Sequence, residues 1–341
     1  MKKIYFSFVH ILRGLAALSV CLYHFTNGNH FFLANDNLIK KVGSYGGYGV
    51  HVFFVISGLV IPFAMHHANY QFKDFKIFLL KRVIRIEPPY LVSFLLIIAL
   101  NFISTLFPYY QGKPFHPDIL MLLSHLGYLN AFFQFEWINP VYWTLAIEFQ
   151  YYILIALIFP LLAVNKKFTW IVTIVFFNSI SFLFPNPNFI FQYSPFFTLG
   201  IVMYKYLVLE IDQPLYAVLV VALLGLIFIK FNLPGLVAGI VPVIFMFIHW
   251  ENKVSVFLGD ISYSLYLLHV PVGLRIINLS MNFVKNDSGK YLIILLALTV
   301  TIALSYMFYK YVELPFKKVS NKIRYRYMQK ITIADISTSV S

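Results

Sequence analysis

Apolar residues in this chain come in long blocks, and this pattern restricts the fold more than any other feature. The blocks are about 20 residues long, the length that a helix needs to cross the hydrocarbon core of a bilayer. Charged residues, proline, glycine and asparagine separate about ten of them. The predicted spans are 6–25, 48–67, 89–107, 142–161, 168–184, 190–207, 215–231, 234–250, 256–279 and 291–312. The sequence therefore predicts an all-α membrane protein, a polytopic bundle of about ten transmembrane helices.

Composition and charge agree with this class. Hydrophobic residues make up 60% of the 341 positions and charged residues only 11%, too few for a soluble domain. The net charge of +13 is concentrated at Lys2 and Lys3, in 73–85, at 166–167 and in 310–330. Such clusters are typical of cytoplasmic loops, so both termini are expected in the cytoplasm, and membrane lipids rather than nucleic acid are the expected partners. The lysines that depart from the pattern are Lys40, Lys41, Lys285 and Lys290.

One membrane domain is expected over 1–316, followed by a basic, frayed cytoplasmic tail over 317–341. The short apolar segment 119–133, which holds His125 and Asn130, is expected to be re-entrant or interfacial rather than a crossing. Cys21 is the only cysteine, so no disulfide can form within the chain, and it is expected to be a small buried hydrophobe. The sequence does not indicate an oligomeric state.

Arg13 and His24 lie inside the first apolar block, where an ionisable residue costs about 2.5–3.5 kcal/mol and usually serves a function. They are eleven positions apart. At about 3.6 residues per turn they share one face of the helix, roughly 16 Å apart along its axis. With the amino terminus inside, Arg13 is expected in the cytoplasmic half and His24 in the outer half, along a path for an anionic donor. An arginine–carboxylate brace and a hydrogen-bonded helix histidine are the alternative.

Glu148 enters the fourth span a turn or two after Tyr142 and Trp143, so it is expected at a depth comparable to His24. A carboxylate there would hold the imidazole in one tautomer and raise its basicity, as a general base requires. A pairing of Glu148 with Arg275 or a lysine, which only holds helices together, is the alternative.

Arg82 and Arg85 share one side of a helical turn at the predicted cytoplasmic surface. Guanidinium groups suit phosphate oxygens, so a nucleotide-bearing cofactor is one interpretation, and anionic lipid headgroups or a topology signal are the others. The small residues of the second span, including Ser57 and Gly58, predict tight helix packing. The sequence contains no nucleophile elbow, metal-ligand pair or phosphate-binding glycine loop, so no metal is expected.

Six motifs occur in the same order as in a known family. They are LRGLAA and LYHF in 12–25, GVHVFFVISG in 49–58, RVIRIEPPY in 82–90, WTLAIEFQYY in 143–152, LGDISYSLYLLH in 258–269 and YVELP in 311–315. Together they cover nearly the whole chain. On these motifs the sequence resembles the acyltransferase-3 family of integral membrane acyltransferases.

The resemblance implies transfer of an acyl group, usually acetyl, from a coenzyme A thioester to a hydroxyl of an extracytoplasmic glycan or glycolipid. By that similarity His24 is the catalytic base and Arg13 helps to position the acyl donor. Arg82 and Arg85 meet the phosphates of coenzyme A. Glu148 orients His24 or the acceptor.

Five further positions complete the expected site. Ser57 is expected to bind the cofactor, and the residues expected to bind substrate are Tyr142, Trp143, His51 and His269. His51 stands where family members often carry another polar or an acidic residue.

The sequence therefore predicts an O-acetyltransferase of the bacterial cytoplasmic membrane that uses acetyl-CoA, by direct transfer or through an acyl-imidazole on His24. One alternative is a proton-coupled transporter or flippase with a relay of Arg13, Glu148 and His269. That alternative expects an inverted repeat with paired broken helices, which the sequence does not show. A membrane glycosyltransferase or polymerase would usually carry a large outer loop, and the longest one here, near 112–116, is modest.

Overall fold

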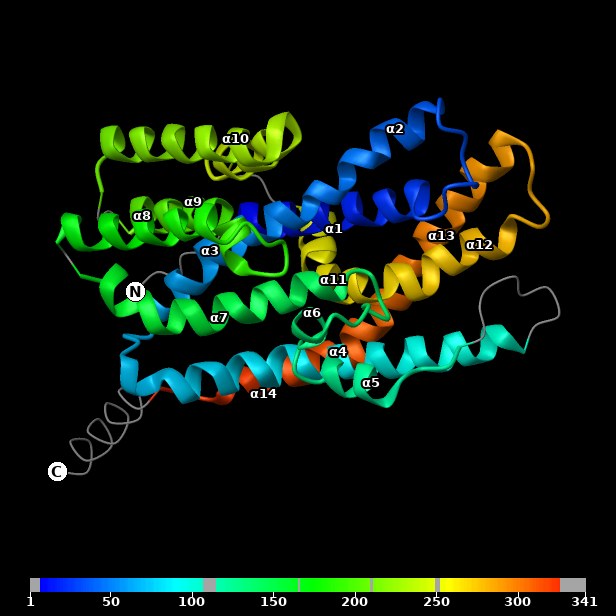
Figure 1. The fold of residues 1–341 in the computed structure, drawn as a ribbon, viewed down its shortest axis with the longest axis horizontal. Coiled ribbons are helices and arrows are strands. Elements are labelled where there is room, and N and C mark those ends of the chain that lie inside the picture. Colours follow the sequence, from blue (N-terminus) through cyan, green and yellow to red (C-terminus); the bar gives the residue numbers. More distant parts are fainter. Residues whose placement is uncertain (1–6, 107–114, 165, 209–210, 249–251, 326–341) are drawn as a thin grey trace. The chain divides into compact units, whose positions relative to one another are not determined.

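Figure 1 shows the computed structural model of the chain, which describes residues 7–106, 115–164, 166–208, 211–248 and 252–325. Every regular element in these ranges is a helix. Within these ranges, seven helical stretches are long and apolar enough to cross a membrane: Ser7–Asn27, Leu38–His67, Phe72–Thr105, Tyr142–Leu162, Gln213–Phe245, Lys253–Ser280 and Asp287–Lys322. The all-α membrane class is confirmed. The number of crossings, about ten, and the cytoplasmic position of both termini stay predictions.

The chain divides into two compact units, each assembled from separate stretches of sequence. The first contains Met1–Phe53, Pro88–Ala146 and Ile244–Glu313, and the second contains Phe54–Glu87, Ile147–Val243 and Leu314–Ser341. The helices of the first unit are α1 (Ser7–Asn27), α2 (Leu38–Ser44), α5 (Ile119–His125), α6 (Asn130–Phe133), α11 (Lys253–Leu268), α12 (Arg275–Ser280) and α13 (Asp287–Phe308). Those of the second are α8 (Lys167–Leu183), α9 (Ser194–Leu207) and α14 (Leu314–Lys322). Residues of α3 (Gly49–His67), α4 (Phe75–Thr105), α7 (Tyr142–Leu162) and α10 (Gln213–Phe245) belong to both units, and all of α10 except its last two residues is in the second.

In the first unit, α1 and α11 approach closely because each carries a glycine where they cross. A Cβ atom on Gly14 would lie 2.8 Å from Leu258 Cβ, and one on Gly259 would lie 2.7 Å from the backbone of His10. Cys21, further along α1, is fully buried, as the sequence predicted. Small residues at such a crossing let two membrane helices come into backbone contact. The crossing therefore fixes α1 against α11.

A buried lysine holds the loop between α1 and α2. Lys40 Nζ donates hydrogen bonds to the carbonyl oxygens of His30 (3.0 Å) and Leu33 (2.9 Å) and to Asn35 Oδ1 (2.9 Å). An ammonium has three protons to donate, and all three are used here. This arrangement allows Lys40 to be only 7% exposed.

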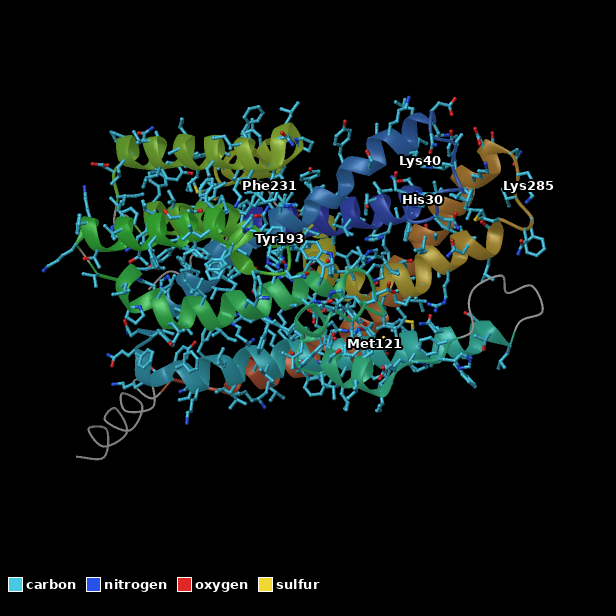
Figure 2. All side chains as sticks on the ribbon, in the orientation of Figure 1. His30, Lys40, Met121, Tyr193, Phe231 and Lys285 are labelled. Carbon is cyan, nitrogen blue, oxygen red and sulfur yellow. The ribbon has the colours of Figure 1, made fainter. Side chains whose placement is uncertain are left out.

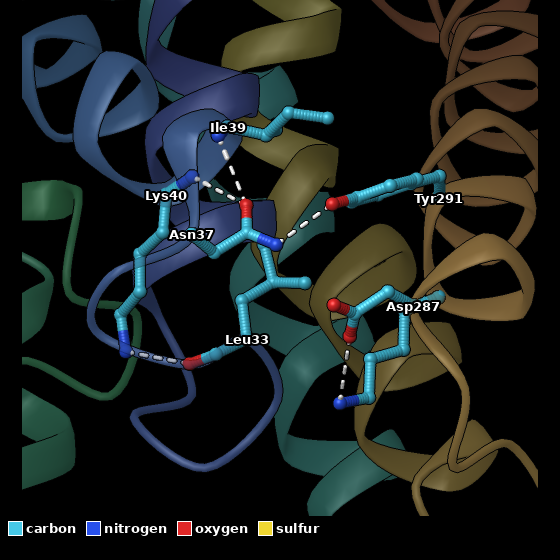
Figure 3. Close-up of polar contacts among 7 residues, drawn as sticks. Leu33, Asn37, Ile39, Lys40, Asp287 and Tyr291 are labelled. Atoms are coloured by element: carbon cyan, nitrogen blue, oxygen red, sulfur yellow. Dashed lines mark hydrogen bonds and ion pairs between the residues drawn. The ribbon is translucent and has the colours of Figure 1, made fainter.

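Asn37 ties the start of α2 to α13 (Figure 3). Its Oδ1 accepts hydrogen bonds from the backbone N–H groups of Ile39 (2.9 Å) and Lys40 (3.3 Å), which caps the helix. Its Nδ2 donates to Tyr291 Oη of α13 at 2.8 Å. Lys40 and Asn37 therefore hold the loop that follows α1, the first through the loop carbonyl groups and the second through α2 and α13.

We expect Lys40→Met to lower the thermal stability of the protein. Methionine keeps the length of the side chain but leaves the three acceptors of the loop without their donor, and a buried unsatisfied polar group costs about 1–3 kcal/mol. The melting temperature of the purified protein in detergent should fall by several degrees. Lys41→Met is the matched control, because Lys41 is the exposed neighbour. Equal melting temperatures for the two variants would contradict the role of Lys40.

In the second unit, α3 and α9 are also in backbone contact. A Cβ atom on Gly58 would lie 2.1 Å from the carbonyl oxygen of Phe197, and one on Gly200 would lie 2.1 Å from that of Val55. The Phe197 ring is stacked on Tyr151 of α7 at 4.2 Å between centroids. The tight packing predicted from the small residues of the second span is therefore confirmed at Gly58.

Two helices make up α10, and they fold back on each other at Asn232. This residue has φ 56° and ψ −164°, outside the helical region. A Cβ atom on Gly239 would lie 2.9 Å from Leu224 Cδ2, although the two residues are fifteen positions apart and would be separated by roughly 22 Å in a straight helix. The reversal lies where the sequence predicted a break between two spans. Next to it, the rings of Phe231 and Tyr193 are 6.1 Å apart (Figure 2).

α4 begins well before the predicted span 89–107. It runs from Phe75 to Thr105 and contains both Pro88 and Pro89. A proline removes one helical N–H donor and usually kinks or ends a helix, but here the helix continues. Arg82 and Arg85 therefore lie within α4 rather than in a loop before it.

The segment expected to fray from position 317 is helical as far as Lys322, the last residue of α14. Within the second unit, Ser320 Oγ donates to the carbonyl oxygen of Lys81 (2.8 Å), and Lys81 Nζ donates to that of Ile323 (2.7 Å). Tyr325 is only 6% exposed. α14 is thus attached to the start of α4. The rest of the expected tail, 326–341, lies outside the described residues.

Candidate functional site

Arg13 lies among polar groups of the first unit. Its Nε donates a hydrogen bond to Ser262 Oγ of α11 at 3.1 Å. The hydroxyl of Tyr309 interacts electrostatically with Asp260, Glu313 and Arg13. A guanidinium and two carboxylates of the first unit therefore interact with one hydroxyl. The predicted role of Arg13 in positioning a donor stays a prediction.

The two closing motifs of the sequence meet at Glu313. Ser264 Oγ of α11 donates a hydrogen bond to Glu313 Oε2 at 2.6 Å, and Glu313 is only 5% exposed. Glu313 ends the π-helical segment Tyr309–Glu313, which follows α13. A buried carboxylate requires such a donor, so this contact joins α11 to the end of α13.

His24 and His269 are brought together by the fold. Their ring centroids are 5.0 Å apart, and the ring planes are tilted by 52°. His24 is half-buried near the end of α1, whereas His269 is fully buried at the start of the π-helical segment His269–Leu274. Both belong to the first unit. Two residues singled out from distant motifs of the sequence are therefore neighbours.

Three other residues predicted to bind substrate have packing partners in the first unit. The ring of His51 is stacked on Tyr48 at 5.1 Å. Tyr142 is fully buried, and its hydroxyl shares a hydrogen bond with Ser93 Oγ at 2.8 Å. Trp143 is half-buried. Their predicted roles stay predictions.

His125 organises the segment that the sequence predicted to be re-entrant or interfacial. Ile138 N donates to His125 Nε2 at 3.1 Å, so the ring proton is on Nδ1, which donates to the carbonyl oxygen of Met121 at 2.7 Å. Burial lowers the pKa of His125, which favours this neutral form. Asn130 is also fully buried and donates to the carbonyl oxygen of Glu136 at 3.3 Å. The sequence analysis singled out His125 and Asn130 but did not predict that both bond to backbone groups of the surrounding segment.

Glu148 lies in a polar cluster of the second unit. Its Oε1 accepts hydrogen bonds from Ser57 Oγ (3.1 Å) and from Tyr152 Oη (2.6 Å). Ser57 and Glu148, which the sequence assigned to cofactor binding and to catalysis, are therefore direct partners. The part of Tyr152 was not predicted. The only sequence signal for it is its spacing of four residues from Glu148, which places both on one face of α7.

Arg82 lies next to this cluster. Its guanidinium lies 5.5 Å from the centroid of the Tyr152 ring and 5.2 Å from that of Phe78. Burial raises the pKa of Tyr325, and the charge of Arg82 opposes that rise. Arg85, one turn further along α4, is half-buried. The second unit thus presents a cation between aromatic rings beside a hydrogen-bonded carboxylate.

His24 belongs to the first unit and Glu148 to the second. Their predicted pairing stays a prediction. The path for an anionic donor along Arg13 and His24 also stays a prediction.

Comparison with known proteins identifies the family. The family model described as "Acyltransferase domain" matches residues 6–310, which is nearly the whole of the 341-residue chain. Neither the curated proteins nor the solved structures contain a match to this chain. The matched range includes His24, Arg82, Glu148 and His269. The chain belongs to the acyltransferase-3 family of membrane acyltransferases.

Proposed function

We propose that this membrane acyltransferase moves an acetyl group from cytoplasmic acetyl-CoA to a hydroxyl of an extracytoplasmic glycan or glycolipid, and that it acts in a bacterial cytoplasmic membrane. The observation that carries the proposal is the match of the acyltransferase domain over 6–310, which contains a histidine in an apolar helix of that domain. Histidine is the side chain best suited to take and return a proton near neutral pH.

His24 is the proposed general base. It takes the proton of the acceptor hydroxyl while the oxygen attacks the thioester carbonyl carbon. The carbon–sulfur bond then breaks, and the proton passes from His24 to the departing thiolate, so His24 ends the cycle unchanged. In the variant with an acyl-enzyme, the imidazole attacks the thioester first and the hydroxyl attacks the acyl-imidazole second.

Arg82 and Arg85 are the proposed contacts for the phosphates of coenzyme A. Arg82 is half-buried, and its guanidinium contacts the rings of Phe78 and Tyr152. These surroundings support the assignment, because an arginine keeps its charge there and can still donate two parallel hydrogen bonds to a phosphate. Ser57 remains the proposed further contact for the cofactor, and Arg13 the residue that positions the thioester. Glu148 is proposed to orient His24 or the acceptor.

Acceptor binding is proposed for residues on two helices. Tyr142 and Trp143 at the start of α7, with His51 of α3, are the proposed contacts for the sugar. Aromatic rings of this kind offer a flat apolar surface and, in tyrosine and tryptophan, one polar atom at the edge.

The proposal is tested with the purified protein in lipid nanodiscs. The protein is incubated with acetyl-CoA labelled in the acetyl group and with a cell-surface glycan extract. We expect free coenzyme A thiol and labelled glycan to form in equal amounts, and mass spectrometry to find one added acetyl group. A transporter or flippase would release no thiol and label no glycan, and that outcome would overturn the proposal.

A further inference from the structure

His269 has one ring nitrogen whose state is fixed by the backbone. Its Nδ1 lies 3.2 Å from the carbonyl oxygen of Leu265. A carbonyl oxygen can only accept a hydrogen bond, so Nδ1 carries the proton and Nε2 carries a lone pair. His269 is thus held as one tautomer, with an acceptor at Nε2.

That acceptor is buried and is available to a donor. His269 is 0% exposed, and Nε2 has no hydrogen-bond partner among the described residues. A buried polar atom without a partner is uncommon, and its persistence needs an explanation. The imidazole of His24 lies beside it, at 5.0 Å between ring centroids.

The separation of the two rings suits a hydrogen bond between them. An N–H···N bond of about 2.9–3.0 Å between two imidazoles puts their centroids about 5 Å apart. The rings are tilted by 52°, and His269 Nε2 has no hydrogen-bond partner among the described residues as they stand, so the bond requires the half-buried His24 ring to rotate about its Cβ–Cγ bond. Catalytic hydrogen bonds often tighten in this way only when substrate is bound.

The backbone around His269 is packed against α1, which keeps the two rings together. A Cβ atom on Gly273 would lie 2.1 Å from Phe25 Cζ, and one on Gly28 would lie 3.0 Å from Leu274 Cδ1. Phe25 is the residue after His24. The π-helical segment His269–Leu274 is therefore seated on the turn of α1 that carries His24.

A histidine that acts as a base at one nitrogen must carry its proton on the other, and that proton needs an acceptor. In serine hydrolases a carboxylate is the acceptor, and it holds the imidazole in the correct tautomer and orientation. We infer that His269 Nε2 is this acceptor for His24, so that His269 is a positioning residue of the reaction. The inference rests on the proposed function and gives His24 an orienting partner within its own unit.

Proton movement is balanced in this arrangement. When His24 takes the proton of the acceptor hydroxyl it becomes an imidazolium with two N–H groups. One N–H holds the proton that later goes to the thiolate, and the other remains hydrogen-bonded to His269 Nε2. His269 neither gains nor loses a proton, because its own proton stays on Nδ1, which donates to the carbonyl oxygen of Leu265.

Variants at position 269 test the inference. His269→Phe keeps the ring but removes the acceptor, and His269→Gln restores an amide oxygen that can accept. We expect His269→Phe to lower kcat about a hundredfold or more, with KM for acetyl-CoA and for the glycan changed less than about twofold, since general-base catalysis contributes about 10²–10⁴. His269→Gln should recover kcat to within about tenfold of the wild type. The matched control is Ser305→Ala, because Ser305 Oγ is another buried polar atom that has no hydrogen-bond partner among the described residues; kcat should not change.

The outcomes separate this inference from the proposed function. If the wild-type protein transfers the acetyl group and His24→Ala does not, but His269→Phe keeps its kcat, the inference is overturned and the function stands. Equal losses in the Phe and Gln variants, with raised KM values or a lower melting temperature, would assign His269 a structural role and also overturn it. The double variant His24→Ala/His269→Phe should be no slower than His24→Ala, because residues that act as a unit do not add.

Discussion

His24→Ala should abolish acyl transfer while the protein still folds. The side chain is half-buried near the end of α1, so its loss removes a base without leaving a large cavity in the protein interior. We expect kcat to fall by at least about a hundredfold, since a positioned general base contributes about 10²–10⁴. The measurement is the release of coenzyme A thiol and the appearance of labelled glycan, with the purified variant at the same concentration as the wild type.

His30→Ala is the matched control for this substitution. His30 follows α1 in the loop, is exposed, and is bonded to Lys40 only through its backbone carbonyl. Its variant should transfer acetyl groups at the wild-type rate. Transfer by His24→Ala at the wild-type rate would remove His24 from the reaction. Label trapped on the wild-type protein without acceptor, and absent from His24→Ala, would favour the acyl-imidazole variant over direct transfer.

Gly200→Ala should prevent the second unit from folding. The added methyl group would lie 2.1 Å from the carbonyl oxygen of Val55, 2.6 Å from Leu59 N and 2.7 Å from the carbonyl carbon of Gly58. All three are backbone atoms of α3, so no side chain can rotate away. We expect a loss of about 3 kcal/mol or more, which is the upper end of what overpacking of a well-packed site costs, because no side chain can yield here. The yield of monodisperse protein after detergent extraction, and its melting temperature, measure the effect.

Gly225→Ala gives the comparison. Gly225 also lies in a long apolar helix, but a Cβ atom there would meet nothing within 4 Å. Alanine favours a helix over glycine by about 0.8–1.0 kcal/mol, so this variant should be as stable as the wild type or slightly more stable. If both alanine variants behave like the wild type, the contact between α3 and α9 is not required for the fold.

Helices whose ends coincide with the ends of an apolar block could be predicted from the sequence. The predicted spans 6–25 and 142–161 correspond to Ser7–Asn27 and Tyr142–Leu162. The start of α4 could not be predicted, because the rule that proline interrupts a helix placed the boundary at Pro89, too late in the sequence. Pro88 and Pro89 usually interrupt a helix, but the apolar residues on both sides continue it to Thr105. The local preference of proline for a helix boundary therefore does not hold at this position.

The candidate site was predictable only along single helices. Periodicity placed Arg13 and His24 on one face of α1, but it does not say which other helix meets that face. The neighbour of His24 is His269, and a π-helical segment begins at that residue. A π-helical turn changes the direction of the side chains that follow it, and no pattern in the sequence announces one. The contact of Ser57 with Glu148 was missed for the same reason, since it joins α3 to α7.

The close crossing of α1 and α11 has a consequence for attempts to build hybrid enzymes. Gly14 accommodates Leu258, and Gly259 accommodates the backbone of His10, so each helix is shaped for the other. A chimera that takes α1 from one homologue and α11 from another would place unmatched side chains at this crossing and displace His24 from His269. The two helices therefore have to be exchanged as a pair. Changes in substrate preference are more safely introduced on other elements.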